Sequence, residues 1–496
     1  MAEDRNSYKN ITKAISLFGG VQILQIIVSI IKNKFVALLI GPVGVGIVGM
    51  LTSSTDLISS MTNFGLRTSA VRDVSQAYST GDTPKISIVI TVLRKLIWFT
   101  GILGMIITFC FSSLLSEWAF GNNDYSVSIK LIAIVVLFTQ LYNGRFVLLQ
   151  GTFQYKAIAK SALIGNLIGL FIIIPLYYIW KIKAIVPVII VTSLCSYLAV
   201  WFYSRKISFP KIKLSIREFW KEGRLMLVLG MAIALSGVVG TGQIYLLRVY
   251  ISNYGNILDV GLYTAGIAIA SSYVGIVLNA MSSDYAPRLS AVANDANLLS
   301  LTINKQATLL ITILSPLIVA FIVFIKQLVI LLYSTKFIAI TTMVEWIMFG
   351  MIFRALSWSI SFCFIARGEP KTFFLNELLT SFYSLFFSVI GYKLANFTGM
   401  GIAFCLTYFC YTIQVYILSR KKFSFHFNHD FFKMVIPQIL ICTFLFILFR
   451  ILGYSVYRYI IGAIALTGIL FLSYYYLDKM IGIRHIIRNR INKIRK

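Results

Sequence analysis

Apolar segments of about twenty residues recur along this chain from Ala14 almost to its C-terminus. An α-helix of about 20 residues crosses a hydrocarbon layer of about 30 Å, so each segment is long enough to span a bilayer. The 496 residues are 58% hydrophobic and 12% charged, with a mean hydropathy of +0.84. Soluble domains carry about 25% charged residues. We therefore expect an all-α integral membrane protein.

Twenty-residue windows predict about fourteen membrane-spanning helices, each uncertain by a few residues at its ends. The predicted spans lie near residues 14–40, 44–65, 87–112, 127–149, 158–180, 184–203, 225–251, 258–282, 306–332, 339–366, 372–393, 398–418, 433–452 and 458–477. No small-residue cleavage site follows the first span, so we expect it to be retained. The predicted external loops are too short for a soluble catalytic domain.

The lysines and arginines lie mainly on one side of these spans. The net charge is +28, and thirty of these residues fall on one side against eight on the other. Because cytoplasmic loops carry the excess of Lys and Arg, both termini are predicted to be cytoplasmic. The basic stretch Arg205–Arg224 and the tail Lys479–Lys496 are the clearest cytoplasmic segments. Charges dispersed among short loops argue against a nucleic-acid binder.

The chain also repeats itself. Val43-Gly44 recurs as Val260-Gly261, and the end of the sixth span, Tyr203–Phe209, resembles the end of the twelfth, Leu418–Phe425. The repeat predicts two six-helix halves of the same orientation. Such pairs enclose a central cavity in alternating-access carriers. The predicted parts are an N-terminal six-helix lobe (1–209), a basic cytoplasmic linker (210–224), a C-terminal six-helix lobe (225–425), and two extra helices with a basic tail (426–496).

Charged side chains inside spans are the first functional candidates, because each costs about 2.5–3.5 kcal/mol to insert. They are Lys32, Lys34, Asp56, Arg145, Arg248, Glu345, Arg354 and Glu377. In the repeat, Lys32 corresponds to a position beside Arg248, so the first helix of each half carries a cation at similar depth. Two such cations suit a diphosphate, because Arg and Lys donate charge-assisted hydrogen bonds to phosphate oxygens. The alternative for each residue is an interfacial side chain or a structural pair, such as Arg354 with Glu377.

The second span is unusually polar. It carries Thr52–Asp56 and then Ser59, Ser60, Thr62 and Asn63, a density that a lipid-facing surface does not tolerate. We expect this span to line water or substrate. Asp56 is either a proton or sodium site or a partner that neutralises a nearby lysine.

Several motif matches carry no function. Gly44-Val-Gly46-Ile-Val-Gly49 fits the dinucleotide fingerprint, but no strand precedes it. The three histidines lie in a loop and in the basic tail, and the six cysteines lie in apolar runs without metal-type spacing. No nucleophile with a base is recognisable, so we predict a transporter without metal or cofactor rather than an enzyme.

A set of short motifs resembles a known family. These motifs follow one another in the same order as in that family. They are the run Lys34–Gly46 with Gly41-Pro42, the turn Phe120–Tyr125, Asn143 before Gly151, Arg248 before Asp259–Tyr263, and Gly350 with Arg354 and Glu377. Together they resemble Wzx-type O-antigen and lipid III flippases of the multidrug/oligosaccharidyl-lipid/polysaccharide (MOP) exporter superfamily. The resemblance covers roughly residues 10 to 425.

This resemblance implies a two-lobe carrier in the bacterial inner membrane. It would move an undecaprenyl-pyrophosphate-linked sugar unit from the cytoplasmic to the periplasmic leaflet, coupled to H⁺ or Na⁺. A monomer working with a polysaccharide polymerase and chain-length proteins would fit. The predicted diphosphate-binding cations are Lys34, Arg248, Arg354, Lys32 and Arg145, and the predicted cavity and ion-coupling residues are Asp56, Glu377, Glu345, Asn63 and Asn143. The spans after Phe425 depart from twelve-span members, whereas lipid II flippases have fourteen.

Two other functions stay open. A cation or drug antiporter of the same superfamily would use an acid-rich cavity. The sequence has five cations and only three acids within its spans, which argues against this function. A membrane polysaccharide polymerase would need a large external loop.

Overall fold

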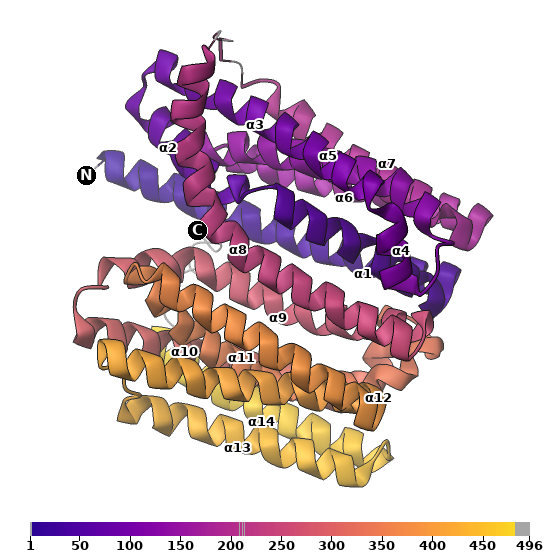
Figure 1. The fold of residues 1–496 in the computed structure, drawn as a ribbon. Coiled ribbons are helices and arrows are strands. Elements are labelled where there is room, and N and C mark those ends of the chain that lie inside the picture. The colour runs from indigo at the N-terminus through magenta and orange to yellow at the C-terminus, as the bar shows by residue number, and fades with distance from the viewer. Residues whose placement is uncertain (1, 208, 211, 213, 482–496) are drawn as a thin grey trace, which may run out of the picture. The chain divides into compact units, whose positions relative to one another are not determined.

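The computed structural model describes residues 2–207, 209, 210, 212 and 214–481, and every regular element among them is helical (Figure 1). The elements are α1 (Ala2–Thr62), α2 (Leu66–Thr80), α3 (Thr83–Cys110), α4 (Ser112–Phe120), α5 (Ser126–Gly151), α6 (Tyr155–Trp180), η1 (Lys181–Ala184), α7 (Ile185–Ser204), α8 (Ile216–Tyr254), α9 (Ile257–Ala291), α10 (Ala296–Leu332), η2 (Thr335–Ile340), α11 (Thr341–Ala366), α12 (Pro370–Phe423), α13 (His429–Leu452) and α14 (Val456–Ile481). The all-α prediction is confirmed.

Ten helices among the described residues are long and apolar enough to cross a membrane. Three of them contain a break in the helical backbone. In α10 the break is at Phe324, whose φ is −106° and ψ 19°. α1 departs from helical geometry at Gly41, whose φ of 65° suits glycine and which Pro42 follows. α12 departs from it at Ala395 and Asn396. Each of these elements therefore consists of two helical segments, and the total of about fourteen spans remains a prediction.

α12 folds back on itself at that break. Close to it, the backbones of Gly391 and Gly399 approach so tightly that a Cβ on either would meet the other's carbonyl group. At the far ends of the same two segments, the Lys422 Nζ donates to a Glu369 carboxylate oxygen at 2.6 Å. This hydrogen bond lowers the pKa of Glu369, which lies just before the helix. α12 is thus an antiparallel helical hairpin.

The internal repeat is visible in the backbone of each half. Lys181, which begins η1 ahead of α7, has φ 48° and ψ −127°. Asn396, which precedes the second segment of α12, has φ 45° and ψ −129°. Positive φ is uncommon in residues other than glycine, so the same conformation before the sixth and the twelfth predicted spans indicates a shared local fold.

The chain divides into two compact units, which we call the N-terminal unit (Met1–Thr264 with Leu332–Lys336) and the C-terminal unit (Ala265–Leu331 with Phe337–Lys496). The predicted lobe boundaries near residues 209 and 225 stay a prediction. α8 begins at Ile216 behind a capping box of Ser215 and Glu218, so the second half of the predicted basic linker is helical. Lys211, Lys213 and the tail residues 482–496, which include His485, lie outside the described residues.

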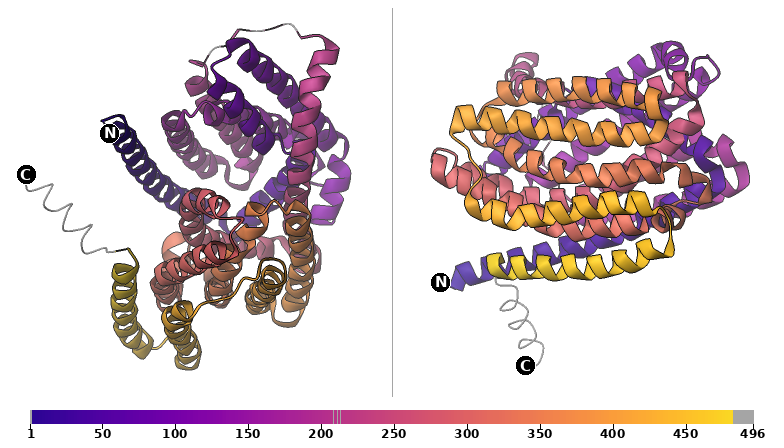
Figure 2. Two further views of the ribbon diagram at one scale, coloured as in Figure 1. Left: turned by 90° about the vertical axis from the view of Figure 1, so that its left-hand side faces the viewer. Right: turned by 90° about the horizontal axis from the view of Figure 1, so that it is seen from below.

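In the C-terminal unit, α13 and α14 are antiparallel neighbours joined by a turn at Gly453, and α13 also packs on α11 (Figure 2). The two extra helices are thereby attached to the body of that unit.

In the N-terminal unit, glycines hold the second segment of α1 against α8 and the start of α9. A Cβ on Gly46 would meet the carbonyl of Ile257, and a Cβ on Gly261 would meet the carbonyl of Pro42. At the other end of this seam, Gly65 and Gly230 meet in the same way. Small residues allow such close packing between membrane helices. Gly44 and Gly261, which correspond in the repeat, lie near the starts of the two helical segments that meet here.

We predict that Gly261→Ala destabilises the protein by about 1–3 kcal/mol, because the added methyl group has no room against the Pro42 carbonyl. Thermal unfolding in detergent measures the change. Gly237→Ala on α8 is the control, since nothing lies within 4 Å of the new Cβ there. Equal unfolding temperatures for the two variants would contradict the proposed tight seam.

Candidate functional site

Arg248 lies on α8 beside the second segment of α1. Its Nη1 donates to the Gly49 carbonyl at 2.7 Å. Its Nε is buried and has no acceptor among the described residues. Asp56, an exposed side chain of α1, interacts electrostatically with Arg248. A guanidinium has five N–H donors. In Arg248, one of the five has an acceptor among the described residues, and four are left for another acceptor.

Most hydroxyl groups of the second predicted span do not face a cavity. Five are buried, and most of them donate to carbonyl groups one turn earlier on the same helix, as Ser54 does to Met50 at 3.0 Å. These residues are Ser53, Ser54, Thr55, Ser59 and Thr62. The expectation that this whole span lines water or substrate is wrong for them, because small hydroxylated side chains also allow close helix packing. Asp56 keeps an exposed side chain.

The other predicted residues of the N-terminal unit lie in varied surroundings. Lys32 is exposed and Lys34 is half-buried on the first segment of α1. The Asn63 side chain accepts from the Gly65 N–H at 2.6 Å and so stabilises the turn between α1 and α2. Asn143 is buried on α5. Asp56 is within electrostatic range of Arg248 without an ion pair among the described residues, and the Asn63 amide is bonded to neither of them.

Arg145 lies apart from Arg248. It lines a pocket between α3, α5 and α7 together with Arg94, and none of the pocket's lining residues comes from α1 or α8.

In the C-terminal unit, Arg354 and Glu377 do not form the ion pair that the sequence left open as an alternative. The Arg354 guanidinium lies over the ring of Tyr408, 5.4 Å from its centroid, and contacts the sulfur of Met351. Glu377 accepts a hydrogen bond of 2.8 Å from Tyr411. Arg354 therefore has no carboxylate partner among the described residues.

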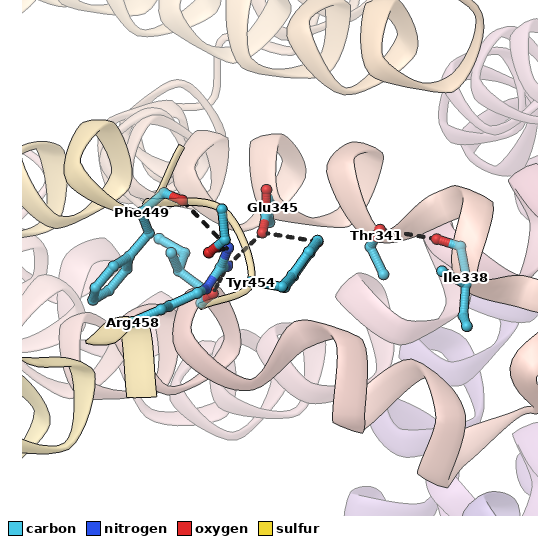
Figure 3. Close-up of polar contacts among 8 residues, drawn as sticks. Ile338, Thr341, Glu345, Phe449, Tyr454 and Arg458 are labelled. Carbon is cyan, nitrogen blue, oxygen red and sulfur yellow. Dashed lines mark hydrogen bonds and ion pairs between the residues drawn. The ribbon is translucent and has the colours of Figure 1, made fainter. Parts of the chain in front are cut away.

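Glu345 forms a buried ion pair with Arg458 of α14. The Arg458 Nη2 lies 2.5 Å from a Glu345 carboxylate oxygen, and their side chains are 2% and 6% exposed (Figure 3). The same nitrogen also donates to the Ile322 carbonyl. Nη1 donates to the carbonyls of Phe449 and Gly453, and Tyr454 donates to the Glu345 carboxylate at 3.4 Å.

This pair joins α14 to α11 across about a hundred residues of chain. Removing one partner of a buried pair leaves the other charge uncompensated, at a cost of about 3–5 kcal/mol. Glu345 was predicted as a cavity or ion-coupling residue. Its saturated surroundings favour the structural alternative instead.

Sequence reasoning missed two arginines. Arg458 lies at the start of the last predicted span, and nothing in its local sequence marks a partner 113 positions away. Arg94 was not among the in-span candidates, although the Arg94-Lys95 pair inside the apolar run of the third span was a usable signal. Among the described residues, no group of three His, Cys, Asp or Glu side chains could hold a metal ion.

We predict that Arg458→Met and Glu345→Gln each destabilise the C-terminal unit by about 3–5 kcal/mol, because each leaves a buried polar partner unmatched. The double variant should recover much of this loss. A double-mutant cycle of detergent-solubilised protein unfolding measures the coupling. Asp284→Asn with Arg288→Gln is the control, since that exposed pair should contribute about 0–1 kcal/mol. Additive effects at Glu345 and Arg458 would contradict the coupling.

Comparison with known proteins gives consistent results. The polysaccharide biosynthesis protein family matches residues 35–342. The chain is 20% identical to the lipid III flippase of Escherichia coli (strain K12) over 432 residues, which cover 83% of this chain and 100% of that protein. The lipid III flippase of Shigella flexneri gives the same figures.

Two solved structures show the fold. An inward-facing multidrug resistance MATE family transporter of the MOP superfamily superposes with a TM-score of 0.67 at 14% identity, covering 83% of this chain and 98% of that one. The lipid II flippase MurJ, in its inward closed conformation, gives a TM-score of 0.66 at 15% identity over 94% of this chain and 98% of that one. The match over residues 35–342 identifies this chain as a member of the polysaccharide biosynthesis protein family, a multi-pass membrane transporter with the MOP exporter fold.

Proposed function

We propose that this chain is an alternating-access flippase for an undecaprenyl-pyrophosphate-linked oligosaccharide, the repeat unit of O-antigen or another surface polysaccharide. The unit would move from the cytoplasmic to the periplasmic leaflet of the inner membrane, with both termini of the protein in the cytoplasm. The family of polysaccharide biosynthesis proteins and the lipid III flippases at 20% identity support this proposal. A polysaccharide polymerase and chain-length proteins are the partners we propose, with the transporter itself a monomer.

The observation that carries the proposal is the state of Arg248. It is half-buried at membrane depth, and one hydrogen bond to the Gly49 carbonyl fixes its guanidinium. Its buried Nε is without an acceptor in the described chain, and an unmet buried donor costs about 1–3 kcal/mol or more when charged. A phosphate oxygen would satisfy such donors in a bidentate geometry.

Arg354 of the C-terminal unit supports the same chemistry independently. Its positive charge lies over the Tyr408 ring without a carboxylate. Arg458 makes a useful contrast, because a carboxylate and three backbone carbonyl groups accept hydrogen bonds from it. Its Nε has no acceptor among the described residues, as in Arg248, so the two arginines differ in the carboxylate and not in Nε. Lys34 and Lys32 remain predicted members of the anion-binding set. Arg145, which was predicted with them, lines a separate pocket with Arg94, and we leave it out of the proposed transport site.

For the coupling ion, H⁺ or Na⁺, we propose Asp56 as the binding residue and Glu377 as a second candidate. Asp56 is exposed and interacts electrostatically with Arg248. Neutralising Asp56 by a proton or cation would strengthen the positive potential at Arg248, so ion and anion binding would be coupled.

A drug antiporter of the MATE type is the rival function, favoured by the fold similarity. Cationic substrates need acidic surroundings. Outside the separate pocket of Arg94 and Arg145, the described in-span candidates are the cations Lys32, Lys34, Arg248 and Arg354 and the acids Asp56, Glu345 and Glu377. Because Arg458 already neutralises Glu345, the balance favours an anionic substrate.

We predict that Arg248→Gln lowers the rate of lipid-linked oligosaccharide translocation about 10- to 100-fold. The loss corresponds to a charged hydrogen bond worth about 1.5–3 kcal/mol. Purified protein in vesicles loaded with a fluorescent polyprenyl-diphosphate oligosaccharide gives the rate, and an imposed proton or sodium gradient in the same vesicles tests the coupling.

Arg217→Gln is the matched control, because it removes the same charge from an exposed position on the same helix. It should translocate at the wild-type rate. Wild-type transport by Arg248→Gln would overturn the proposed role of this residue, and gradient-driven transport of an organic cation by the unchanged protein would favour the antiporter.

A further inference from the structure

The N-terminal unit contains a basic pocket that the proposed transport site does not use. A cavity of about 80 Å³ lies between α3, α5 and α7. Gly144 of α5 faces Ile97 of α3, where a Cβ would have almost no room, so the two helix backbones are close beside the cavity. The polar side-chain groups of its lining belong to Arg94 and Trp98 on α3, Arg145 on α5 and Tyr197 on α7.

The two arginines in this pocket repel one another and are not neutralised. Both guanidinium groups line the same small cavity, and two like charges at short range repel one another. Neither guanidinium has a hydrogen bond or an ion pair within the described part of the chain. Adjacent unpaired cations at membrane depth are costly, and a bound anion would offset that cost.

The surroundings of the pocket indicate what kind of molecule carries that anion. Trp98 and Phe99 of α3 are 50% and 61% exposed, and Leu198 and Phe202 of α7 are 45% and 46% exposed. Large exposed apolar side chains on a membrane protein face lipid chains. A ligand that combines an anionic phosphate with long apolar chains fits both the arginines and these flanks.

The depth of the pocket agrees with a headgroup. Arg94 lies eleven residues after the start of α3 and Arg145 six residues before the end of α5. At 1.5 Å per residue these positions are about 16 and 9 Å from the helix ends on the predicted cytoplasmic side, and long arginine side chains extend toward the interface. Basic pockets between membrane helices on that side are suited to anionic lipid headgroups.

We propose that the Arg94–Arg145 pocket binds the phosphodiester headgroup of an anionic phospholipid of the cytoplasmic leaflet. This lipid is a structural ligand distinct from the transported substrate, and its site is independent of Arg248. The proposal does not rest on the proposed transport function.

Native mass spectrometry of the purified protein tests this site with phosphatidylglycerol and phosphatidylcholine as probes. The unchanged protein should retain phosphatidylglycerol in preference to phosphatidylcholine. Arg94→Gln with Arg145→Gln should reduce phosphatidylglycerol binding at least about tenfold, as expected for loss of about 1.4 kcal/mol. Lys85→Gln with Lys156→Gln, which removes two exposed cations of the same unit, should leave it unchanged.

A photoreactive residue at position 197 tests the site without removing either arginine. It should label phosphatidylglycerol in vesicles. Equal loss of lipid in the Lys85/Lys156 control would show a non-specific charge effect and overturn the site. Labelling of a polyprenyl diphosphate in preference to phosphatidylglycerol would assign the pocket to the substrate instead, and absence of labelling would overturn the proposal.

Discussion

A positive charge at membrane depth has to be neutralised or solvated by something, and the arginines of this protein meet that requirement in two different ways. Arg458 is neutralised within the chain, by Glu345 and by three backbone carbonyls. Arg248 and Arg354 are held in place by a carbonyl or an aromatic ring and have no ion pair among the residues the structure describes. The first arrangement stabilises helix packing, whereas the second leaves donors for an anionic ligand.

Close helix packing makes the second arrangement possible. The glycine contacts at Gly46 and Gly261 hold the start of α9 against the second segment of α1, and Gly65 meets Gly230 of α8 just after that segment ends. At that short separation Arg248 reaches the Gly49 carbonyl, and Ser60 shares a hydrogen bond of 2.7 Å with Thr241. The packing of small residues thus fixes the direction of a long charged side chain, and a preorganised guanidinium loses less entropy when it binds phosphate.

The sequence predicts the helical class, most span positions and the repeat, because each rests on hydropathy or on local similarity. The matching backbone of Lys181 and Asn396 supports the repeat. Hydropathy and local similarity do not predict which residues far apart in the chain form pairs. Glu345 looked like a cavity acid because Arg458 lies over a hundred positions later. The hydroxyl groups of Ser53 and Ser54 were expected to face substrate. Hydropathy does not distinguish a helix face packed against other helices from one exposed to water.

The central claim is that positively charged side chains within the membrane recognise the diphosphate of the lipid carrier. Its most direct test is the affinity of the protein in lipid nanodiscs for two ligands with the same glycan and polyprenyl chain, one joined by a diphosphate and one by a monophosphate. We predict that the diphosphate binds at least about tenfold more tightly, as one added charge-assisted hydrogen bond would give. Equal affinity for the two ligands would contradict anion recognition by these cations.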